Sequence, residues 1–168
     1  MSTSHDKNLI LIGGKNGFGK TNFLLALVWC LYGDKIEFID ENFKKEIKKE
    51  KNFSQFIKQT LNWEAEKEGK SNFFVELYID EIEIPKENSF DNVYTKCKIK
   101  REFDINTMRD NLEITFQETE ENVFTTDDEK IDFINDYIVP LEAAKFVFFD
   151  AEKIASLAEL TTKEEGEF

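Results

Sequence analysis

The chain contains little histidine, cysteine, proline or glycine, and each scarcity excludes a class of function. Its single histidine, His5, cannot build a histidine-based metal cage or a Ser-His-Asp triad within the chain. The two cysteines, Cys30 and Cys97, lie far apart in the sequence and are expected to be reduced core residues of a cytoplasmic protein. Only 7 glycines and 2 prolines stand against 17 phenylalanines, which favours a packed globular body over a disordered tail.

Positive charge and long hydrophobic runs are also scarce. Lysine and arginine number 22 against 35 acidic residues, so the formal net charge is -13. This charge disfavours an unaided electrostatic grip on DNA or an anionic membrane, so any contact with nucleic acid must be local or supplied by another part. The longest apolar stretch, residues 23–32, is about half the length of a membrane-spanning helix, and no signal segment opens the chain. We expect no membrane partner.

The most informative feature that is present is a phosphate loop, G-K-N-G-F-G-K-T, at residues 14–21. Its glycines let backbone N–H groups approach a phosphate closely, while Lys20 reaches the β- and γ-phosphates and Thr21 takes a position on Mg²⁺. The expected ligands are therefore ATP and Mg²⁺, with Lys20 in a catalytic role. The predicted nucleotide-binding residues are Gly14, Lys15, Asn16, Gly17, Phe18, Gly19, Lys20, Thr21 and Asn22.

The flanks of this loop support a nucleotide site over a simple glycine-rich turn with a solvated lysine. The aliphatic run at residues 9–12 predicts a strand buried on both faces of a sheet. After the loop, apolar residues recur at helical spacing, and Gly33 stands where a helix C-cap is expected. The recurring residues are Phe23, Leu24, Leu27, Val28 and Leu31, with Ala26, Trp29 and Cys30 filling nearly the whole circumference. A helix beginning near Lys20 adds its positive end to the phosphate site.

In the middle of the chain, the spacing of the apolar residues changes from that of helices to that of strands. Residues 40–72 predict one or two amphipathic surface helices, whose charged face is solvated. Residues 73–84 and 93–101 alternate apolar and charged residues, which predicts an antiparallel hairpin, with a third strand at 112–117 and a fourth around 123–124. The second strand carries a basic side that either contacts phosphate or pairs with acids of the first strand. These basic residues are Lys96, Lys98, Lys100 and Arg101, and the acids are Glu76, Asp80, Glu81 and Glu83.

The last part of the chain predicts a helix after Thr126, ending before Pro140, and then a buried strand over residues 145–149 that ends on Asp150. An acid at the end of a parallel strand lies where Mg²⁺ or its waters would sit. Asp150 is thus a candidate metal ligand and catalytic residue, either as a Walker-B acid with Glu152 as general base or as a contact from a connecting loop. In the plainest interpretation, Asp150 is the N-cap of the last helix.

These motifs resemble a known family. G-G-K-N-G-F-G-K-T followed by an apolar helix ending in L-Y-G is similar to the N-terminal half of the SMC-type ABC ATPase head, and F-V-F-F-D-A-E-K-I resembles a segment of DndD, an ATPase associated with DNA phosphorothioate modification and phage restriction. The resemblance places Asp150 at the Q-loop position. Ala151, where DndD-like proteins have glycine, departs from the pattern, as does the lack of one or two strands ahead of residues 9–12.

The resemblance implies an α/β fold, the N-terminal lobe of a P-loop NTPase head with a small antiparallel β subdomain. It divides the chain into 1–39 (strand, loop and helix), 40–72 (surface helices), 73–125 (β arm) and 126–168 (helix, strand and start of a coiled-coil helix). No signature motif or Walker B can be identified, so we expect one lobe of a larger protein. Its expected partners are a complementary C-terminal lobe, a second head in a dimer, DNA and other defence-system proteins.

The implied function is ATP-driven dimerisation of two heads, with hydrolysis that acts on DNA in modification, restriction or phage defence. The isolated lobe should then hydrolyse ATP poorly. A self-contained P-loop ATPase or kinase, with Asp150 as the Walker-B acid, is the alternative. A non-enzymatic module whose phenylalanine-rich surface docks the complementary lobe is a third hypothesis, compatible with the first.

Overall fold

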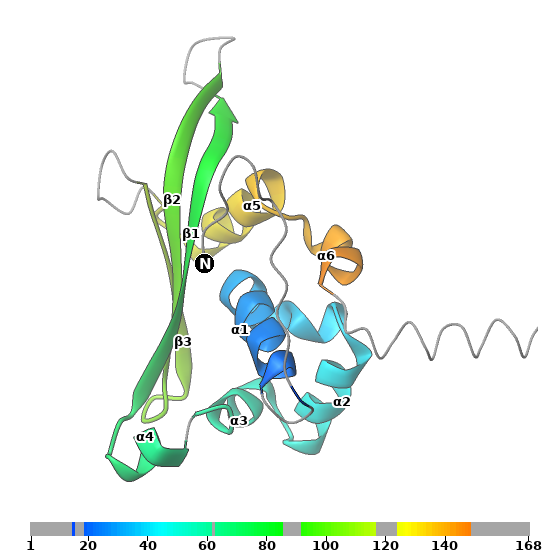
Figure 1. Ribbon diagram of the computed structural model, residues 1–168, viewed down its shortest axis with the longest axis vertical. Helices are drawn as coiled ribbons and strands as arrows, with labels where there is room; N and C mark the ends of the chain where they lie inside the picture. Colours follow the sequence, from blue (N-terminus) through cyan, green and yellow to red (C-terminus); the bar gives the residue numbers. More distant parts are fainter. Residues whose placement is uncertain (1–14, 16–18, 62, 86–91, 117–123, 149–168) are drawn as a thin grey trace, which may run out of the picture.

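A long antiparallel sheet forms one layer of the protein, and helices cover one of its faces (Figure 1). The computed structural model describes residues 15, 19–61, 63–85, 92–116 and 124–148. The helices are α1 (Lys20–Tyr32), the 3-10 helix η1 (Gly33–Phe38), α2 (Glu41–Lys49), α3 (Phe53–Lys58), α4 (Trp63–Lys67), α5 (Asp127–Tyr137) and α6 (Leu141–Val147). The strands are β1 (Asn72–Pro85), β2 (Asn92–Asp104) and β3 (Arg109–Phe116). The described part is thus α/β.

Helix α1 is the centre of the core. Its residues Leu25, Val28 and Leu31 are buried in one apolar cluster with Ile99 and Ile114 of the sheet. The helix follows the phosphate loop, as the apolar periodicity predicted, and it ends at Gly33, whose N–H donates to the carbonyl of Trp29. Gly33 has φ +55, a conformation that favours glycine, so the predicted C-cap is confirmed. The strand predicted at residues 9–12 lies outside the described residues.

Over residues 40–72, where one or two helices were predicted, the chain forms three short helices, α2, α3 and α4. Each of the first two begins at a polar N-cap: Asp40 accepts from the N–H of Asn42 at 2.7 Å, and Asn52 accepts from the N–H of Gln55 at 2.9 Å. Lys51 between them has φ +74, which interrupts the helical path. Local capping therefore divides a segment that reads as continuous when hydrophobic spacing alone is considered.

The sheet is a meander of order β1-β2-β3, with both neighbouring pairs antiparallel. The predicted hairpin and third strand are confirmed. Both hairpin strands are longer than predicted, and the third strand starts at Arg109 instead of residue 112. A bulge between Ile79 and Ile82 breaks the register of the first pair, and Glu81 there has φ +61. The fourth strand predicted around residues 123–124 is wrong for its described part, because Phe124 belongs to no strand. Its ring packs on that of Phe133, with 5.2 Å between the ring centroids. Val123 lies outside the described residues.

Helix α5 starts as the sequence predicted. The hydroxyl of Thr126 accepts from the N–H of Glu129, and the Glu129 carboxylate accepts from the N–H of Thr126, forming a reciprocal capping box. The helix ends at Tyr137, before Pro140. Phe133 and Ile134 point from it into the core.

The buried strand predicted for residues 145–149 is wrong over its described part. Residues up to Val147 belong to helix α6, and the N–H of Ala144 donates to the carbonyl of Pro140 at 3.0 Å. Phe146 is 73% exposed and Val147 is 56% exposed, whereas Phe148 is half-buried and packs against the core, so the run is not buried as a strand would be. The helix forms because the sequence Leu-Glu-Ala-Ala-Lys is rich in strong helix formers, and it starts after Pro140, the N-cap residue, whose carbonyl accepts from the N–H groups of Ala143 and Ala144.

Candidate nucleotide-binding site

The candidate site lies at the N-terminus of α1, where the phosphate loop leads into the helix. Gly19 is the N-cap residue and has φ +84 and ψ +11, the left-handed conformation. The N–H of Phe23 donates to the carbonyl of Gly19 at 2.9 Å, so the first helical hydrogen bond begins at this residue. A Cβ at position 19 would meet no atom of the described residues within 4 Å, so it is the backbone conformation that favours glycine here.

Lys20 reaches back toward Lys15. Its Nζ donates to the carbonyl of Lys15 at 3.1 Å, which holds the ammonium group near the start of α1. Thr21 and Asn22 follow in the first helical turn and are exposed. The structure therefore brings five of the predicted residues to one helix end: Lys15, Gly19, Lys20, Thr21 and Asn22.

The electrostatics of this helix end suit an anion. The first turn of α1 contains no acidic residue, and no described side chain accepts a hydrogen bond from the first N–H groups of the helix as a cap. The first N–H groups of a helix lack partners within it and carry the positive end of the helix dipole. An anion near Thr21 would thus meet oriented N–H groups and the Lys20 ammonium together.

The other predicted site residues lie outside the described part of the chain. They are Gly14, Asn16, Gly17, Phe18, Asp150 and Glu152. The functional interpretations of Asp150 assumed a buried strand leading to it, and α6 removes residues 145–147 of that strand. The roles of Asp150 and Glu152 stay predictions.

A small cavity of about 140 Å³ lies beside the same helix, lined by Asn22 and Trp29 of α1 and by Ile57 and Phe73, among others. Drug-sized ligands generally occupy at least about 300 Å³, so this cavity is too small to enclose a nucleotide. The Trp29 indole Nε1 is buried and has no hydrogen-bond partner in the described structure. The sequence marks Trp29 only as an apolar residue of the helix that follows the loop, and no pattern in it predicts the cavity.

The basic side of β2 is engaged in ion pairs. Lys96 pairs with Asp80 at 3.0 Å and Lys98 with Glu76 at 3.8 Å, which are the cross-strand pairs that the sequence allowed. Lys100 pairs within its own strand, with Glu102 at 2.9 Å. These contacts favour the salt-pairing interpretation over phosphate contact for the three lysines.

Arg101 differs from those lysines because it faces the core. Its side chain is buried and donates to Asp110 at 2.7 Å and to the carbonyl of Cys30 at 3.0 Å. Grouping it with the solvent-facing lysines was therefore wrong. In a strand, alternate residues share a face, so Arg101 belongs with Cys97 and Ile99 on the buried side.

An α/β fold with a G-x-x-x-x-G-K-T sequence at the start of its central helix defines the class of P-loop NTPases. Residues 5–166 match the family described as AAA domain, so the chain belongs to that family. ATP binding and ATPase activity follow at the level of the family. Comparisons with curated proteins and with solved structures found no match.

Among the described residues, no helix has the length and apolar character needed to cross a membrane.

Proposed function

We propose that this chain is the ATP-binding N-terminal lobe of an SMC-like ATPase head, a DndD-like one, which uses ATP-driven head dimerisation and hydrolysis to act on DNA. The observation that carries the proposal is the end of α1, where left-handed Gly19 and the folded-back Lys20 frame an exposed, positively polarised helix terminus. The motif resemblance at both ends of the chain supports the choice of an SMC-like head.

The described residues fit a magnesium nucleotide. Lys20 would hold the β- and γ-phosphates, and Gly19, which has no Cβ, would let them approach the start of α1 closely. Thr21, exposed in the first turn, would hold Mg²⁺, which offsets phosphate charge when it is bound. The chain's own contribution at this end is therefore to bind and orient the triphosphate.

The first test is calorimetric titration of the chain with MgATP. Lys20→Ala should weaken binding about 10-fold to 150-fold, because a charge-assisted contact contributes about 1.5–3 kcal/mol. Lys45→Ala is the matched control: it removes one positive charge from an exposed position on α2. Equal affinity for the Lys20→Ala variant and the native sequence would refute ATP binding by this loop.

A second test separates one lobe of a head from a self-contained enzyme. In the proposal, this chain alone turns ATP over poorly, because the opposing signature motif lies on another lobe. Glu152→Gln should leave that low rate unchanged. Brisk hydrolysis by the chain, abolished by Glu152→Gln, would instead establish a self-contained ATPase or kinase.

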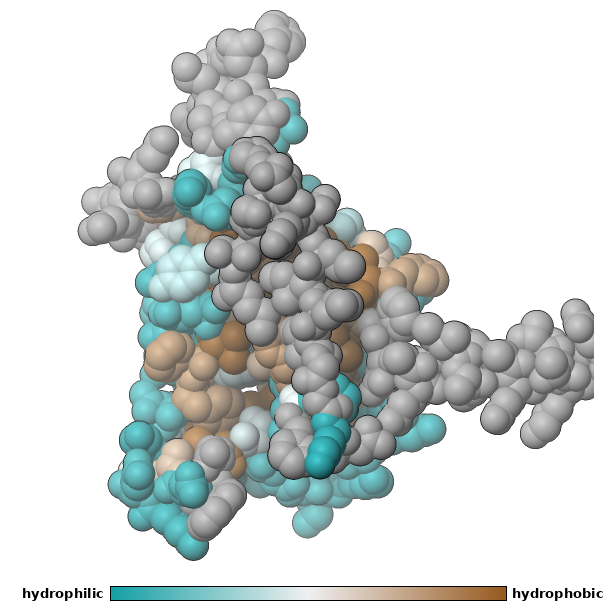
Figure 2. Space-filling model, in the orientation of Figure 1, coloured by the Kyte–Doolittle hydropathy of each residue, from teal (hydrophilic) through white to brown (hydrophobic). Residues whose placement is uncertain are grey.

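Exposed apolar side chains favour a partner surface. Phe146 and Val147 stand out on α6, and Figure 2 shows hydrophobic residues reaching the surface around this helix. We assign the partner as the complementary C-terminal lobe, which is compatible with the ATPase proposal. Phe146→Ser should weaken co-purification with that lobe while leaving MgATP affinity unchanged; unchanged co-purification would refute α6 as the contact.

The proposed DNA contact does not rest on β2, because its lysines are paired with acids. It is assigned to the complete two-headed assembly. Binding of a DNA duplex should therefore require the complementary lobe and increase with MgATP. Equally tight binding by this chain alone would refute that assignment.

A further inference from the structure

Helix α1 does not supply a positive charge for its own C-terminal end. Its last turn contains no basic residue, although the last carbonyls of a helix lack partners and carry the negative end of the dipole. Arg101 of β2 fills this role from a position 70 residues further along. Its Nε donates to the carbonyl of Cys30 at 3.0 Å and its Nη2 donates to the carbonyl of Leu31 at 3.4 Å.

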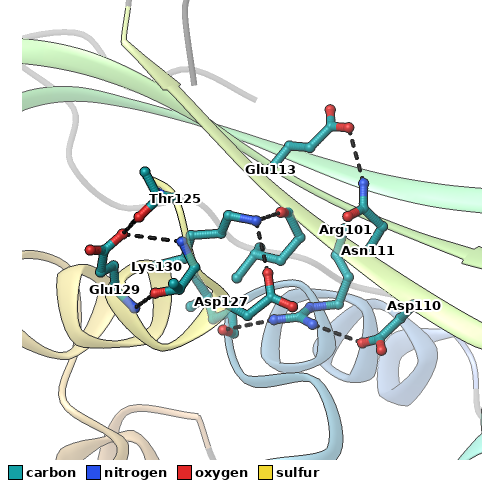
Figure 3. A network of polar contacts seen from close by, with 11 residues as sticks. Arg101, Asp110, Asn111, Glu113, Thr125, Asp127, Glu129 and Lys130 are labelled. Atoms are coloured by element: carbon teal, nitrogen blue, oxygen red, sulfur yellow. Dashed lines mark hydrogen bonds and ion pairs between the residues drawn. The ribbon is translucent and has the colours of Figure 1, made fainter. Parts of the chain in front are cut away.

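The guanidinium is itself held by a second strand. Its Nη1 donates to Oδ2 of Asp110 on β3 at 2.7 Å, and Arg101 is only 7% exposed (Figure 3). Gly33 provides the space, because a Cβ there would lie 2.7 Å from Nη1 of Arg101. Two strands and a glycine thus clamp the end of α1 opposite the phosphate loop.

The clamp differs in kind from the apolar contacts along α1. Burial of Val28 and Leu31 stabilises the helix against the sheet, but hydrophobic contact is non-directional and lets a helix tilt or slide. Charge-assisted hydrogen bonds from a planar guanidinium fix both distance and angle. Arg101 is therefore one of the directional contacts that orient α1, beside the hydrogen bond from the Tyr32 hydroxyl to the carbonyl of Val139 at 2.7 Å.

We propose that Arg101 is a positioning residue for the phosphate-binding end of α1, an inference that rests on the proposed ATP-binding function. The 13 residues of α1 span about 20 Å, so a tilt of about 3° at the clamp moves the other end by about 1 Å. A misplacement of about 1 Å can cost up to about 100-fold in activity. Loss of the clamp would thus be felt at Gly19, Lys20 and Thr21 without any contact to the ligand.

The experiment compares Arg101→Lys with Lys130→Met. The arginine variant keeps the charge and loses the fork that reaches two carbonyls and a carboxylate. Lys130 is a buried cation that ties α5 to β3 through the carbonyl of Leu112 at 2.7 Å, and within the described part of the chain its side-chain hydrogen bonds go to Leu112 and Asp127 rather than to α1. Its loss therefore destabilises the protein elsewhere. Both variants are measured at a temperature at which each is fully folded.

Two readouts are taken: MgATP affinity by calorimetry, and backbone amide resonances of Gly19, Lys20 and Thr21 in nucleotide-free protein. Arg101→Lys should weaken MgATP about 5-fold to 20-fold and shift those resonances. Lys130→Met should lower the melting temperature with neither effect. If Arg101→Lys fails to fold, Asp110→Asn, which removes only the carboxylate anchor, is measured in the same way.

The outcomes separate the two proposals. Unshifted amide resonances and native affinity in a destabilised Arg101→Lys variant would overturn the positioning role and leave ATP binding intact. If the native chain does not bind MgATP, the proposed function fails, and the nucleotide-free resonances still decide whether Arg101 directs α1.

Discussion

Replacing Gly33 with alanine should be among the most costly single substitutions at the end of α1. Gly33 has φ +55 and ψ -125, a region that side chains other than hydrogen rarely adopt, and the backbone strain contributes about 1–3 kcal/mol. In addition, the new Cβ would lie 2.7 Å from Nη1 and 3.0 Å from Cζ of Arg101. Arg101 would have to move and lose at least one charge-assisted hydrogen bond, at about 1.5–3 kcal/mol.

The combined loss for Gly33→Ala is about 2.5–6 kcal/mol. For a chain of this length, each kcal/mol shifts the melting temperature by about 2–4 °C, so thermal unfolding followed by circular dichroism should show a decrease of about 10 °C. Urea unfolding gives the free energy directly.

The matched control is Gly69→Ala. Gly69 also has positive φ, +76, but a Cβ there would meet none of the described atoms within 4 Å. Only backbone strain applies, about 1–2 kcal/mol. Gly33→Ala should therefore cost clearly more than Gly69→Ala, and the excess should shrink when Arg101→Lys is already present, because the clashing group is gone. Equal costs at both glycines would refute the close approach of Arg101.

Further expectations concern α5 and the buried thiols. Thr126→Ala removes half of the capping box and should cost about 1 kcal/mol in urea unfolding, whereas no loss would mean that the box does not stabilise α5. Burial raises the pKa of both Cys30 and Cys97 from 9.0 to about 11, so neither thiol should react with a thiol reagent at pH 8 until the protein is unfolded. Since the unfolded chain ionises first, the contribution of the protonated thiols to stability should be complete below pH 9 and should be lost as the pH rises from 9 toward 11; a flat profile there would contradict burial of the thiols.

Elements with complete local signals could be predicted from the sequence. Helix α5 carries its N-cap, first-turn acids and terminating proline within one segment, and the β1-β2 hairpin alternates clearly over both strands. Helix α1 has sustained apolar spacing and Gly33 as its cap. In each case the interactions that determine the element lie within a few residues of it.

Helix α6 shows where such reasoning fails. A short apolar run such as Phe146 to Phe149 is compatible with a buried strand or with a helix, and periodicity cannot separate them. The deciding signals lay upstream, in Pro140 and the Leu-Glu-Ala-Ala-Lys sequence. The exposure of Phe146 was not predictable, because it depends on which elements cover the helix.

Arg101 was half predictable. Strand parity with Cys97 and Ile99 places its side chain on the buried face, and a buried cation needs partners. The identity of those partners depends on tertiary folding, because the carbonyls of Cys30 and Leu31 precede Arg101 by about 70 residues. The last turn of α1 lacks a basic residue, and β2 carries one on its buried side. Neither feature alone indicates a contact between them. Together they explain why this sheet carries a buried arginine, since the same charge that would be costly in an apolar core satisfies the helix end on which the phosphate loop depends.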